Sequence, residues 1–267
     1  MLKLIWLSDL HFVAEGDVLG HDPRVRVQAA IDFINRHHAD SDLCVLSGDL
    51  VNRGTLEDYG ALAERLSGLN LPVLPMVGNH DDRQLLRAAL SLPEDGMADF
   101  VQYAVQTAQG MIICLDTQKP GSDGGELCAE RRAWLQDVLR THADTPAYLF
   151  MHHPPMALGL PMQDVDKLDD GEGVLDLICG HANVRHLFIG HVHRPITGTV
   201  KGIPFATMRS VLYQAPAPVP AWDWDSFQPG EEAPNLGVLT IGELGVNLQY
   251  VQFCSFDEGV IRNKRTL

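Results

Sequence analysis

Residues 46–52 read Leu-Ser-Gly-Asp-Leu-Val-Asn, and the position of Asp49 in this stretch decides how we interpret the fold. Asp49 follows a short apolar run, residues 43–46, that predicts a buried strand. Gly48 stands beside it and allows the backbone to turn tightly. A carboxylate is thereby presented at a strand end. A lone aspartate there is usually a turn or cap residue, so its meaning depends on similar residues elsewhere.

Four other predicted strands also end in metal-binding residue types. These pairs are Asp9 and His11 after residues 4–7, Asn79 and His80 after 73–77, His152 and His153 after 148–151, and His191 and His193 after 184–189. Functional groups in open α/β sheets collect at the carboxyl ends of the strands. We therefore expect these residues to converge on Asp49, although they are far apart in the chain.

The elements between these strands predict β-α-β units with parallel strands. Asp22 and Pro23 are typical of a helix start, and apolar residues follow them at helical spacing. Further helices are expected at 55–66, 83–90 and 130–140, a hairpin from 100–105 and 111–115, a loop at 159–173, and strands at 203–208, 236–241 and 246–253. Residues 209–235 are expected to be irregular, and the tail 262–265 to fray.

Composition indicates one large core and limits the partners. The chain has 267 residues with 45% hydrophobic content, so we expect a single domain over residues 1–267. Its net charge of -15 gives no basic surface for a nucleic-acid polymer or an anionic membrane. The N-terminus has no signal-peptide pattern and no apolar run is long enough to span a membrane, which predicts a cytoplasmic protein.

The donor types favour a catalytic metal site over a structural one. Carboxylate, amide oxygen and imidazole suit Mn, Fe, Zn or Co better than Ca. The five cysteines are scattered and include no Cys-x-x-Cys pair, which argues against a zinc ribbon and against a disulfide framework.

The ordered motifs resemble those of the calcineurin-like metallophosphoesterase superfamily. They are Asp9-x-His11, Gly48-Asp49, Gly78-Asn79-His80-Asp81, His152-His153-Pro154-Pro155 and Gly190-His191-x-His193. The similarity is greatest to class III cyclic-nucleotide phosphodiesterases and bacterial metal-dependent glycerophosphodiesterases. It implies an α/β fold of two stacked mixed β-sheets flanked by helices.

The resemblance also implies two metal ions, Mn or Fe with Zn or Co as alternatives. One ion would be held by Asp9, His11, Asp49 and His193, and the other by Asp49, Asn79, His152 and His191. Asp49 would then bridge the two ions. The charge of such a site suits a phosphodiester monoanion. Two divalent ions, offset by two carboxylates and a hydroxide, leave about one net positive charge to hold it.

The implied function is hydrolysis of small phosphodiesters, cyclic nucleotides or glycerophosphodiesters, by a hydroxide that bridges the ions. Asp49 and His80 are the expected catalytic residues, with His80 contacting the phosphate or aiding the leaving group. A phosphomonoesterase is the nearest alternative, and a scaffold without catalysis is another. The expected partner is a small-molecule substrate, with a homo-oligomer as a further possibility.

Several residues have two interpretations. His152 is expected to be the ligand and His153 a supporting residue, because neighbours on a strand face opposite sides. Asn52 either approaches the metals or caps the next helix. Tyr213 stands where glycerophosphodiesterase relatives carry a histidine, so Asn79, His80, Asn52 and Tyr213 are the expected substrate contacts.

Two segments are expected to set specificity, residues 156–170 and 209–235. Trp222 and Trp224 in the second segment either stack on a nucleobase, form an oligomer contact, or pack the segment over the sheet edge, which we favour. The remaining histidines are expected to be solvated: His21, His37, His38, His142, His181 and His186.

Overall fold

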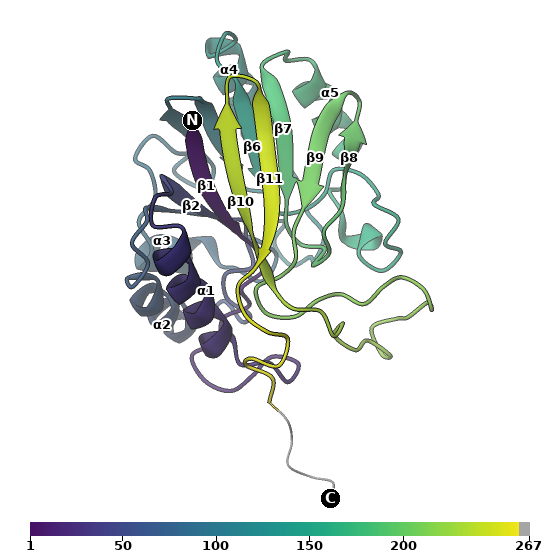
Figure 1. Cartoon of the computed structure of the whole chain (residues 1–267). Helices are drawn as coiled ribbons and strands as arrows, with labels where there is room; N and C mark the ends of the chain where they lie inside the picture. Colours follow the sequence, from purple (N-terminus) through teal and green to yellow (C-terminus); the bar gives the residue numbers. More distant parts are fainter. Residues whose placement is uncertain (262–267) are drawn as a thin grey trace, which may run out of the picture.

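Two mixed β-sheets lie face to face in the computed structural model, which describes residues 1–261 (Figure 1). The predicted fraying of residues 262–265 falls outside the described residues. In the first sheet, β1 (Leu2–Leu7), β2 (Leu43–Leu46) and β3 (Val73–Pro75) run parallel. The strands β10 (Asn235–Gly242) and β11 (Gly245–Gln252) add antiparallel pairs, giving the order β11-β10-β1-β2-β3.

The second sheet has the order β4-β5-β6-β7-β9-β8. Four of its strands are parallel neighbours: β5 (Gly110–Leu115), β6 (Ala147–Met151), β7 (Val184–Ile189) and β9 (Ile203–Thr207). The edge strands β4 (Tyr103–Thr107) and β8 (Thr197–Val200) pair antiparallel to β5 and β9. Two mixed sheets with flanking helices confirm the predicted fold class.

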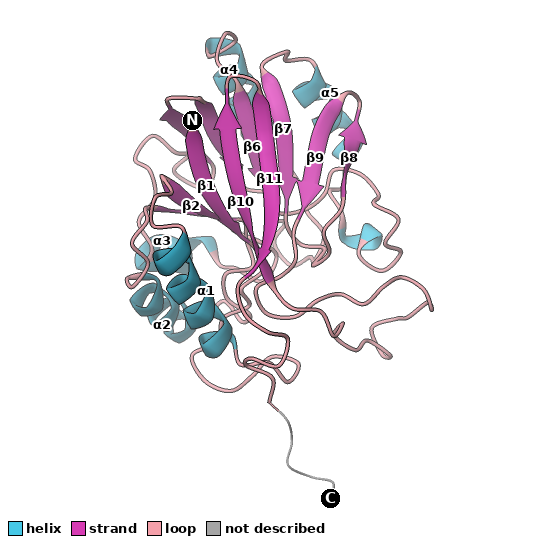
Figure 2. Ribbon diagram, viewed as in Figure 1, coloured by secondary structure: helices cyan, strands magenta, loops and turns pink. Residues whose placement is uncertain are grey.

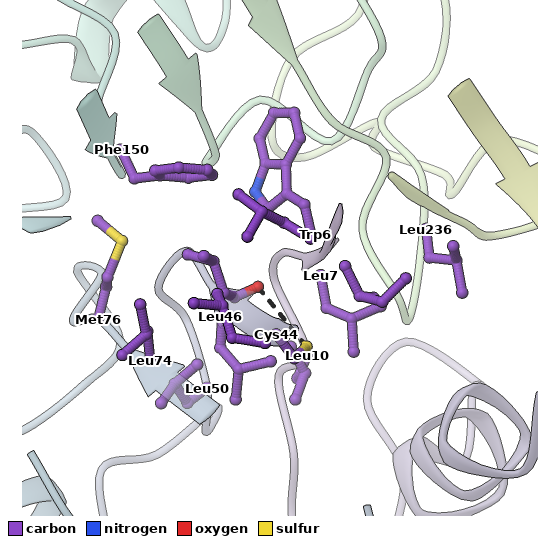
Figure 3. Close-up of a cluster of buried hydrophobic side chains, with 14 of the residues drawn as sticks. Trp6, Leu7, Leu10, Cys44, Leu46, Leu50, Leu74, Met76, Phe150 and Leu236 are labelled. Carbon is purple, nitrogen blue, oxygen red and sulfur yellow. Dashed lines mark hydrogen bonds between the residues drawn. The ribbon is translucent and has the colours of Figure 1, made fainter. Parts of the chain in front are cut away.

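Aromatic residues from both sheets form the core between them. The ring of Trp6 on β1 meets Phe150 edge-on at a centroid distance of 6.0 Å (Figure 3). It meets Phe188 in the same way at 5.4 Å. The two phenylalanine rings stack at 4.6 Å. Because Trp6 is fully buried, its indole N–H needs an acceptor, and it donates to Ser47 Oγ at 2.8 Å. The core is thereby tied to the stretch that carries Asp49.

Helices cover the outer faces. The helices α1 (Pro23–His37), α2 (Leu56–Leu66) and α3 (Arg83–Ala89) lie together beside the first sheet, while α4 (Ala129–Thr141) and α5 (Gly171–Cys179) accompany the second (Figure 1). Alternate residues of β5 divide between the two cores, because Ile112 and Cys114 join the larger cluster while Ile113 and Leu115 pack with α4 and α5. None of the helices in residues 1–261 combines the length and apolar character needed to cross a membrane.

The helix α5 corrects the prediction that residues 159–173 are a loop. A short 3-10 turn, Asp164–Asp166, lies within that range, and α5 already begins at Gly171 with Asp170 as its cap. Gly171 is the first residue of α5 and is not part of a loop. A Cβ at this position would lie 2.0 Å from the carbonyl oxygen of Pro155, so glycine is required for packing. The other predicted helices and the hairpin between β4 and β5 are confirmed, with bounds that differ by a few residues.

Three histidines expected to be solvated are instead packed, and one of them is His38, whose two ring nitrogens are buried without a hydrogen-bond partner in residues 1–261. His21 is buried, and His186 lies on β7 with its ring stacked on Phe188 at 4.3 Å. Within residues 1–261, Nε2 of His186 has no hydrogen-bond partner. Burial lowers the pKa of His186 from 6.5 to about 4.

This lowered pKa predicts a pH-dependent contribution to stability. Folding favours the neutral ring of His186, so this residue costs no stability above pH 6.5. The free energy of unfolding then decreases as the pH falls from 6.5 toward 4, because the unfolded state binds a proton that the folded state does not. We expect wild type to lose about 1 kcal/mol more than His186→Phe between pH 8 and pH 5, allowing for partial exposure. Urea unfolding of both proteins at the two pH values measures this difference. Equal losses would contradict the prediction.

Candidate metal centre

The polar strand ends meet where the loops gather at one end of the two sheets (Figure 2). Backbone hydrogen bonds join the two N-terminal motifs, from Asp9 N to Gly48 O at 3.1 Å and from His11 N to Asp49 O at 2.9 Å. The C-terminal motif joins them through His191 N, which donates to Asp9 Oδ1 at 3.2 Å. Residues from both sheets are therefore fixed relative to one another, as the sequence predicted.

Five of the predicted ligands have left-handed backbone conformations. Their φ values are 55° for Asp9, 43° for His11, 49° for Asp49, 68° for His191 and 51° for His193. Such a conformation costs a residue other than glycine roughly 1–2 kcal/mol. Strain of this kind persists where function requires it. Here it turns each chain segment sharply after its strand and leaves the side chains at the shared end.

Gly48 and Gly78 make room for the ligands. A Cβ on Gly48 would lie 2.5 Å from His152 Nδ1, and Gly48 also has a φ of 96°. A Cβ on Gly78 would lie 2.2 Å from Asp49 Oδ1 and 2.7 Å from His152 Nε2. The glycines preceding Asp49 and Asn79 are thus part of the site.

The nitrogens of His11 and His193 face each other in a way that needs a cation. The two Nε2 atoms are 3.2 Å apart. His193 donates its Nδ1–H to the carbonyl oxygen of Tyr213 at 2.8 Å, which leaves a lone pair on Nε2. Nδ1 of His11 lies 3.1 Å from Asn52 Oδ1, which is an acceptor. The ring proton of His11 is therefore on Nδ1, and its Nε2 also carries a lone pair. Two lone pairs facing each other are repulsive, so a positive charge, either a proton or a metal ion, must lie near both; Asp9 Oδ1 is 3.3 Å from His193 Nε2 and favours such a charge.

His152 shows the same arrangement in the second group. Its Nδ1 donates to Ser47 O at 2.8 Å, so Nε2 is again the free nitrogen. That atom lies 3.4 Å from Asp49 Oδ2 and 3.2 Å from Asn79 Oδ1. Burial lowers the pKa of His152, but Asp49 outweighs it and raises that pKa to about 9. In the protein without metal, a proton therefore takes the place that a metal ion would fill.

The two carboxylates are ionised although they are buried. Burial raises the pKa of Asp9, but its charge interaction and hydrogen bond with His193 outweigh that effect, and the pKa falls to about 2. Burial likewise opposes ionisation of Asp49, and the nearby histidines hold its pKa well below the usual value. Asp9, Asp49 and His152 present ligand atoms within 4.8 Å of one another, as do Asp9, His11 and His193. This donor set fits two divalent ions.

His153 and Asn52 have supporting positions. The ring of His153 is engaged at both nitrogens, with Thr117 Oγ1 at 2.8 Å and the Asp123 carbonyl oxygen at 3.1 Å. Asn52 does not cap the next helix, because Thr55 caps α2 by accepting from Asp58 N. Instead Asn52 holds His11 through its side chain, and its carbonyl oxygen accepts from His80 Nδ1 at 3.0 Å.

Asp81 is a supporting residue to which the sequence assigned no role. Its carboxylate accepts from Leu50 N at 3.1 Å, Gly78 N at 2.8 Å and Tyr59 Oη at 2.7 Å. It therefore ties the loop of Asp49 to the loop of Asn79. Burial, then the charge of Asp49, raises the pKa of Asp81 to about 6. Its place at the end of Gly78-Asn79-His80-Asp81 was the signal that could have identified it.

A cavity of about 350 Å³ opens above the candidate ligands. Its floor includes His11, Asp49, Asn79, His80, His191 and His193. Its walls come from the two segments expected to set specificity and from a loop near α4. They include Asp123, Gln163, Asp166, Tyr213, Trp224 and Phe227. Of these wall residues, sequence reasoning had singled out only Tyr213 and Trp224.

The aromatic segment does more than pack against the sheet edge. Trp222 and Trp224 have ring centroids 5.4 Å apart, and both contact Phe227. Trp224 is 57% exposed yet also lines the cavity. Residues 208–234, between β9 and β10, contain no helix or extended strand, and Asn235 already begins β10.

The fold and the carboxylate–imidazole donor set together define a candidate metal centre at the shared end of two mixed β-sheets. The chain belongs to the calcineurin-like phosphoesterase family, which it matches over residues 2–195.

Several relatives share most of the chain. A probable cyclic nucleotide phosphodiesterase of Rhodopseudomonas palustris is 37% identical over 218 residues, which cover 80% of this chain and 79% of the relative. A glycerophosphodiester phosphodiesterase of Enterobacter lignolyticus is 29% identical, with 80% and 79% covered. The crystal structure of a dimetal phosphatase from Danio rerio has a TM-score of 0.71 at 14% identity, covering 95% of this chain and 97% of that one. This last likeness supports the fold.

Proposed function

We propose that this protein is a dinuclear metal-dependent phosphodiesterase that acts on small phosphodiesters such as cyclic nucleotides or glycerophosphodiesters. The facing Nε2 atoms of His11 and His193, 3.2 Å apart with both Nδ1 atoms engaged, are the observation that carries the proposal. The relatives named as cyclic nucleotide and glycerophosphodiester phosphodiesterases support the substrate class.

The proposed ligand sets are those implied by the sequence. Asp9, His11, Asp49 and His193 hold one ion, and Asp49, Asn79, His152 and His191 hold the other, with Mn or Fe proposed before Zn or Co. When bound, the two ions offset the charge of the phosphate and lower the pKa of water for attack on phosphorus. We place the reaction in the cytoplasm, where the five free cysteines would stay reduced.

His80 is proposed as a donor to the substrate. Its backbone N–H donates to Asp49 Oδ1 at 2.9 Å, and its Nδ1 is held by Asn52, so the ring is fixed at the cavity floor. Burial lowers the pKa of His80, but Asp49 outweighs it and the net shift is upward. The ring therefore retains a proton on Nε2 more readily, and it can donate that proton to a phosphoryl or leaving oxygen.

Tyr213 is proposed as a second donor. Its ring lies 4.6 Å from that of His193 and its hydroxyl has no hydrogen-bond partner in the part of the chain that the structure describes. Burial, then the charges of Asp49 and Asp9, raises the pKa of Tyr213. The phenol therefore stays protonated and can donate to a substrate oxygen.

A comparison of two chromogenic esters tests the proposed function. With Mn-loaded protein, we expect bis-p-nitrophenyl phosphate to be hydrolysed at least about tenfold faster, in kcat/KM, than p-nitrophenyl phosphate, because the dianionic monoester exceeds the positive charge that the site offers. Chelator-treated protein is the control and should be inactive. Faster hydrolysis of the monoester would instead indicate a phosphomonoesterase.

A further inference from the structure

The strand β5 ends without a candidate ligand, although it runs parallel to β6 and ends at the same edge of the sheet. β1, β2, β3, β6 and β7 each lead into a proposed ligand, whereas β5 leads into Asp116, Thr117 and Gln118. These three residues, which we call the β5 terminus, are 0, 1 and 8% exposed. Buried polar side chains require partners, so the partners of the β5 terminus show what this strand end does in place of ligation.

Gln118 holds the loop that carries Asn79 and His80. Its side-chain Nε2 donates to the carbonyl oxygen of Gly78 at 3.0 Å and to that of Asp81. These two carbonyl groups stand immediately before and after Asn79-His80, so one amide group spans the loop and uses both of its N–H donors. The loop belongs to the first sheet and Gln118 to the second. The contact therefore ties the backbone on either side of Asn79 to the strand beside β6.

A buried ion-pair cluster keeps Gln118 in place. Arg83, the first residue of α3, donates to both carboxylate oxygens of Asp116, at 2.6 and 2.8 Å, and to the carbonyl oxygen of Gln118 at 2.7 Å. Arg131 of α4 donates to the same carbonyl oxygen at 3.0 Å and to Asp116 O at 2.8 Å. A two-pronged contact between guanidinium and carboxylate fixes direction as well as distance. The β5 terminus is therefore held from α3 and from α4.

Thr117 holds the neighbouring histidine loop. Its Oγ1 accepts from the backbone N–H of His153 at 3.2 Å and lies 2.8 Å from His153 Nδ1. His153 directly follows His152. Three consecutive residues therefore contact the loops that carry Asn79 and His152, two proposed ligands of the same ion. Within residues 1–261, the β5 terminus makes no hydrogen bond to the ligands that belong to the other ion alone, Asp9, His11 and His193.

We propose that the β5 terminus is a positioning segment for one of the two metal ions, the ion shared by Asn79 and His152, and that Gln118 is its central residue. The inference rests on the proposed function, because it takes the ligand sets given there. Gln118 is not among the described residues that line the cavity, so it acts through Asn79 and not on the substrate. It sets where Asn79 Oδ1 stands relative to His152 Nε2, 3.2 Å away. Residues that orient a ligand change metal affinity by about 10–100-fold.

Removing the two donors of Gln118 tests the inference. Gln118→Met keeps the length of the side chain but leaves the carbonyl groups of Gly78 and Asp81 without this partner. Mn²⁺ is added to the metal-free full-length protein, and free Mn²⁺ is followed by electron paramagnetic resonance. We expect wild type to bind two ions, and Gln118→Met to bind one with wild-type affinity and the other about 10–100-fold more weakly. Half-maximal hydrolysis of bis-p-nitrophenyl phosphate should need correspondingly more Mn²⁺.

Gln102→Met is the matched control. Gln102 is a fully buried amide of the same cluster, which donates to Arg131 O at 2.9 Å and accepts from Asp116 N at 3.3 Å. Among the described residues it makes no hydrogen bond to the loop at 78–81. A purely structural role of the cluster predicts the same change of metal affinity in both variants. We expect Gln102→Met to keep both affinities, even where urea unfolding shows it to be destabilised as much as Gln118→Met.

Two further variants identify the ion that is affected. In the Asn79→Ala background, Gln118→Met should leave the affinity of the remaining ion unchanged, because its effect passes through Asn79. Thr117→Val removes the side-chain contacts with His153 and should also weaken one ion selectively. This variant decides the question if Gln118→Met does not fold.

The inference would be overturned by unchanged affinities in Gln118→Met, by equal weakening of both ions, or by selective weakening in Gln102→Met. A further loss in the Asn79→Ala background would overturn it as well. If wild type binds two ions but hydrolyses no diester, the proposed function fails, while the titration still decides the inference. If wild type binds only one ion, both fail.

Discussion

Replacing Asp49 by alanine is expected to lower the metal content from two ions per chain to at most one and kcat by at least about a thousandfold. Asp49 Oδ2 lies 3.6 Å from His11 Nε2 and 3.4 Å from His152 Nε2, so this carboxylate lies between the two histidine groups. Asp9 Oδ1 is farther from His152 Nε2, at 3.9 Å. The loss of Asp49 therefore affects both proposed ions. Elemental analysis and hydrolysis of bis-p-nitrophenyl phosphate measure the two effects.

Comparison with Asn79→Ala separates the bridging role from simple ligation. Within residues 1–261, the side chain of Asn79 makes its hydrogen-bond contact with His152, at 3.2 Å. Its loss is therefore expected to weaken one ion and leave about one per chain tightly bound. Asp95→Ala removes an exposed carboxylate and should keep both ions and full activity. Two tightly bound ions in Asp49→Ala, or activity within tenfold of wild type, would refute the bridging role.

Replacing Gly78 by alanine is expected to be the most damaging change outside the ligands. The added methyl group would lie 2.2 Å from Asp49 Oδ1 and 2.5 Å from Asp49 N, and neither atom can move without disturbing a ligand. We expect a loss of about 2–3 kcal/mol in the free energy of unfolding from overpacking. Activity should fall at least about a hundredfold because the bridging carboxylate is displaced.

Gly60→Ala is the matched control for this change. Gly60 lies on the exposed side of α2, and a Cβ there meets nothing within 4 Å. Alanine is expected to stabilise the protein by about 0.5–1 kcal/mol through helix propensity, with unchanged activity. Chemical unfolding and metal analysis of both variants test the contrast. Wild-type metal content and kcat in Gly78→Ala would show that the crowding is relieved elsewhere.

The convergence of the candidate ligands could be predicted from the sequence because these residues follow strands. Parallel strands share one carboxyl end, so the ends of β1, β2, β3, β6 and β7 could be placed together without knowing how any loop folds. The glycines before Asp49 and Asn79 fitted this pattern. The expected difference between the two adjacent histidines is seen in their contacts. His152 faces Asp49, while both nitrogens of His153 contact Thr117 and Asp123.

The cavity wall could not be predicted to the same depth. Asp123, Gln163 and Phe227 lie in irregular segments, where no periodicity relates a side chain to a face of the fold. Their positions depend on tertiary contacts such as the hydrogen bond from His153 to the Asp123 carbonyl oxygen. For the same reason the loop predicted at 159–173 was drawn too long, since the need for glycine at position 171 comes from its contact with Pro155. His186 is a different case, because it lies within the strand predicted at 184–189, two residues before Phe188, and the alternation of strand side chains could have placed both rings on one face.

Because β1 lies between β2 and β10, the first sheet cannot form completely until β10 has been translated. The ribosome delivers β1 near the start, whereas its antiparallel partner β10 spans Asn235–Gly242. Until then one edge of β1 has unpaired backbone groups, which readily pair with other chains. Three of the proposed ligands, His152, His191 and His193, also emerge late. We therefore expect incomplete chains to associate through this open edge until β10 has been made.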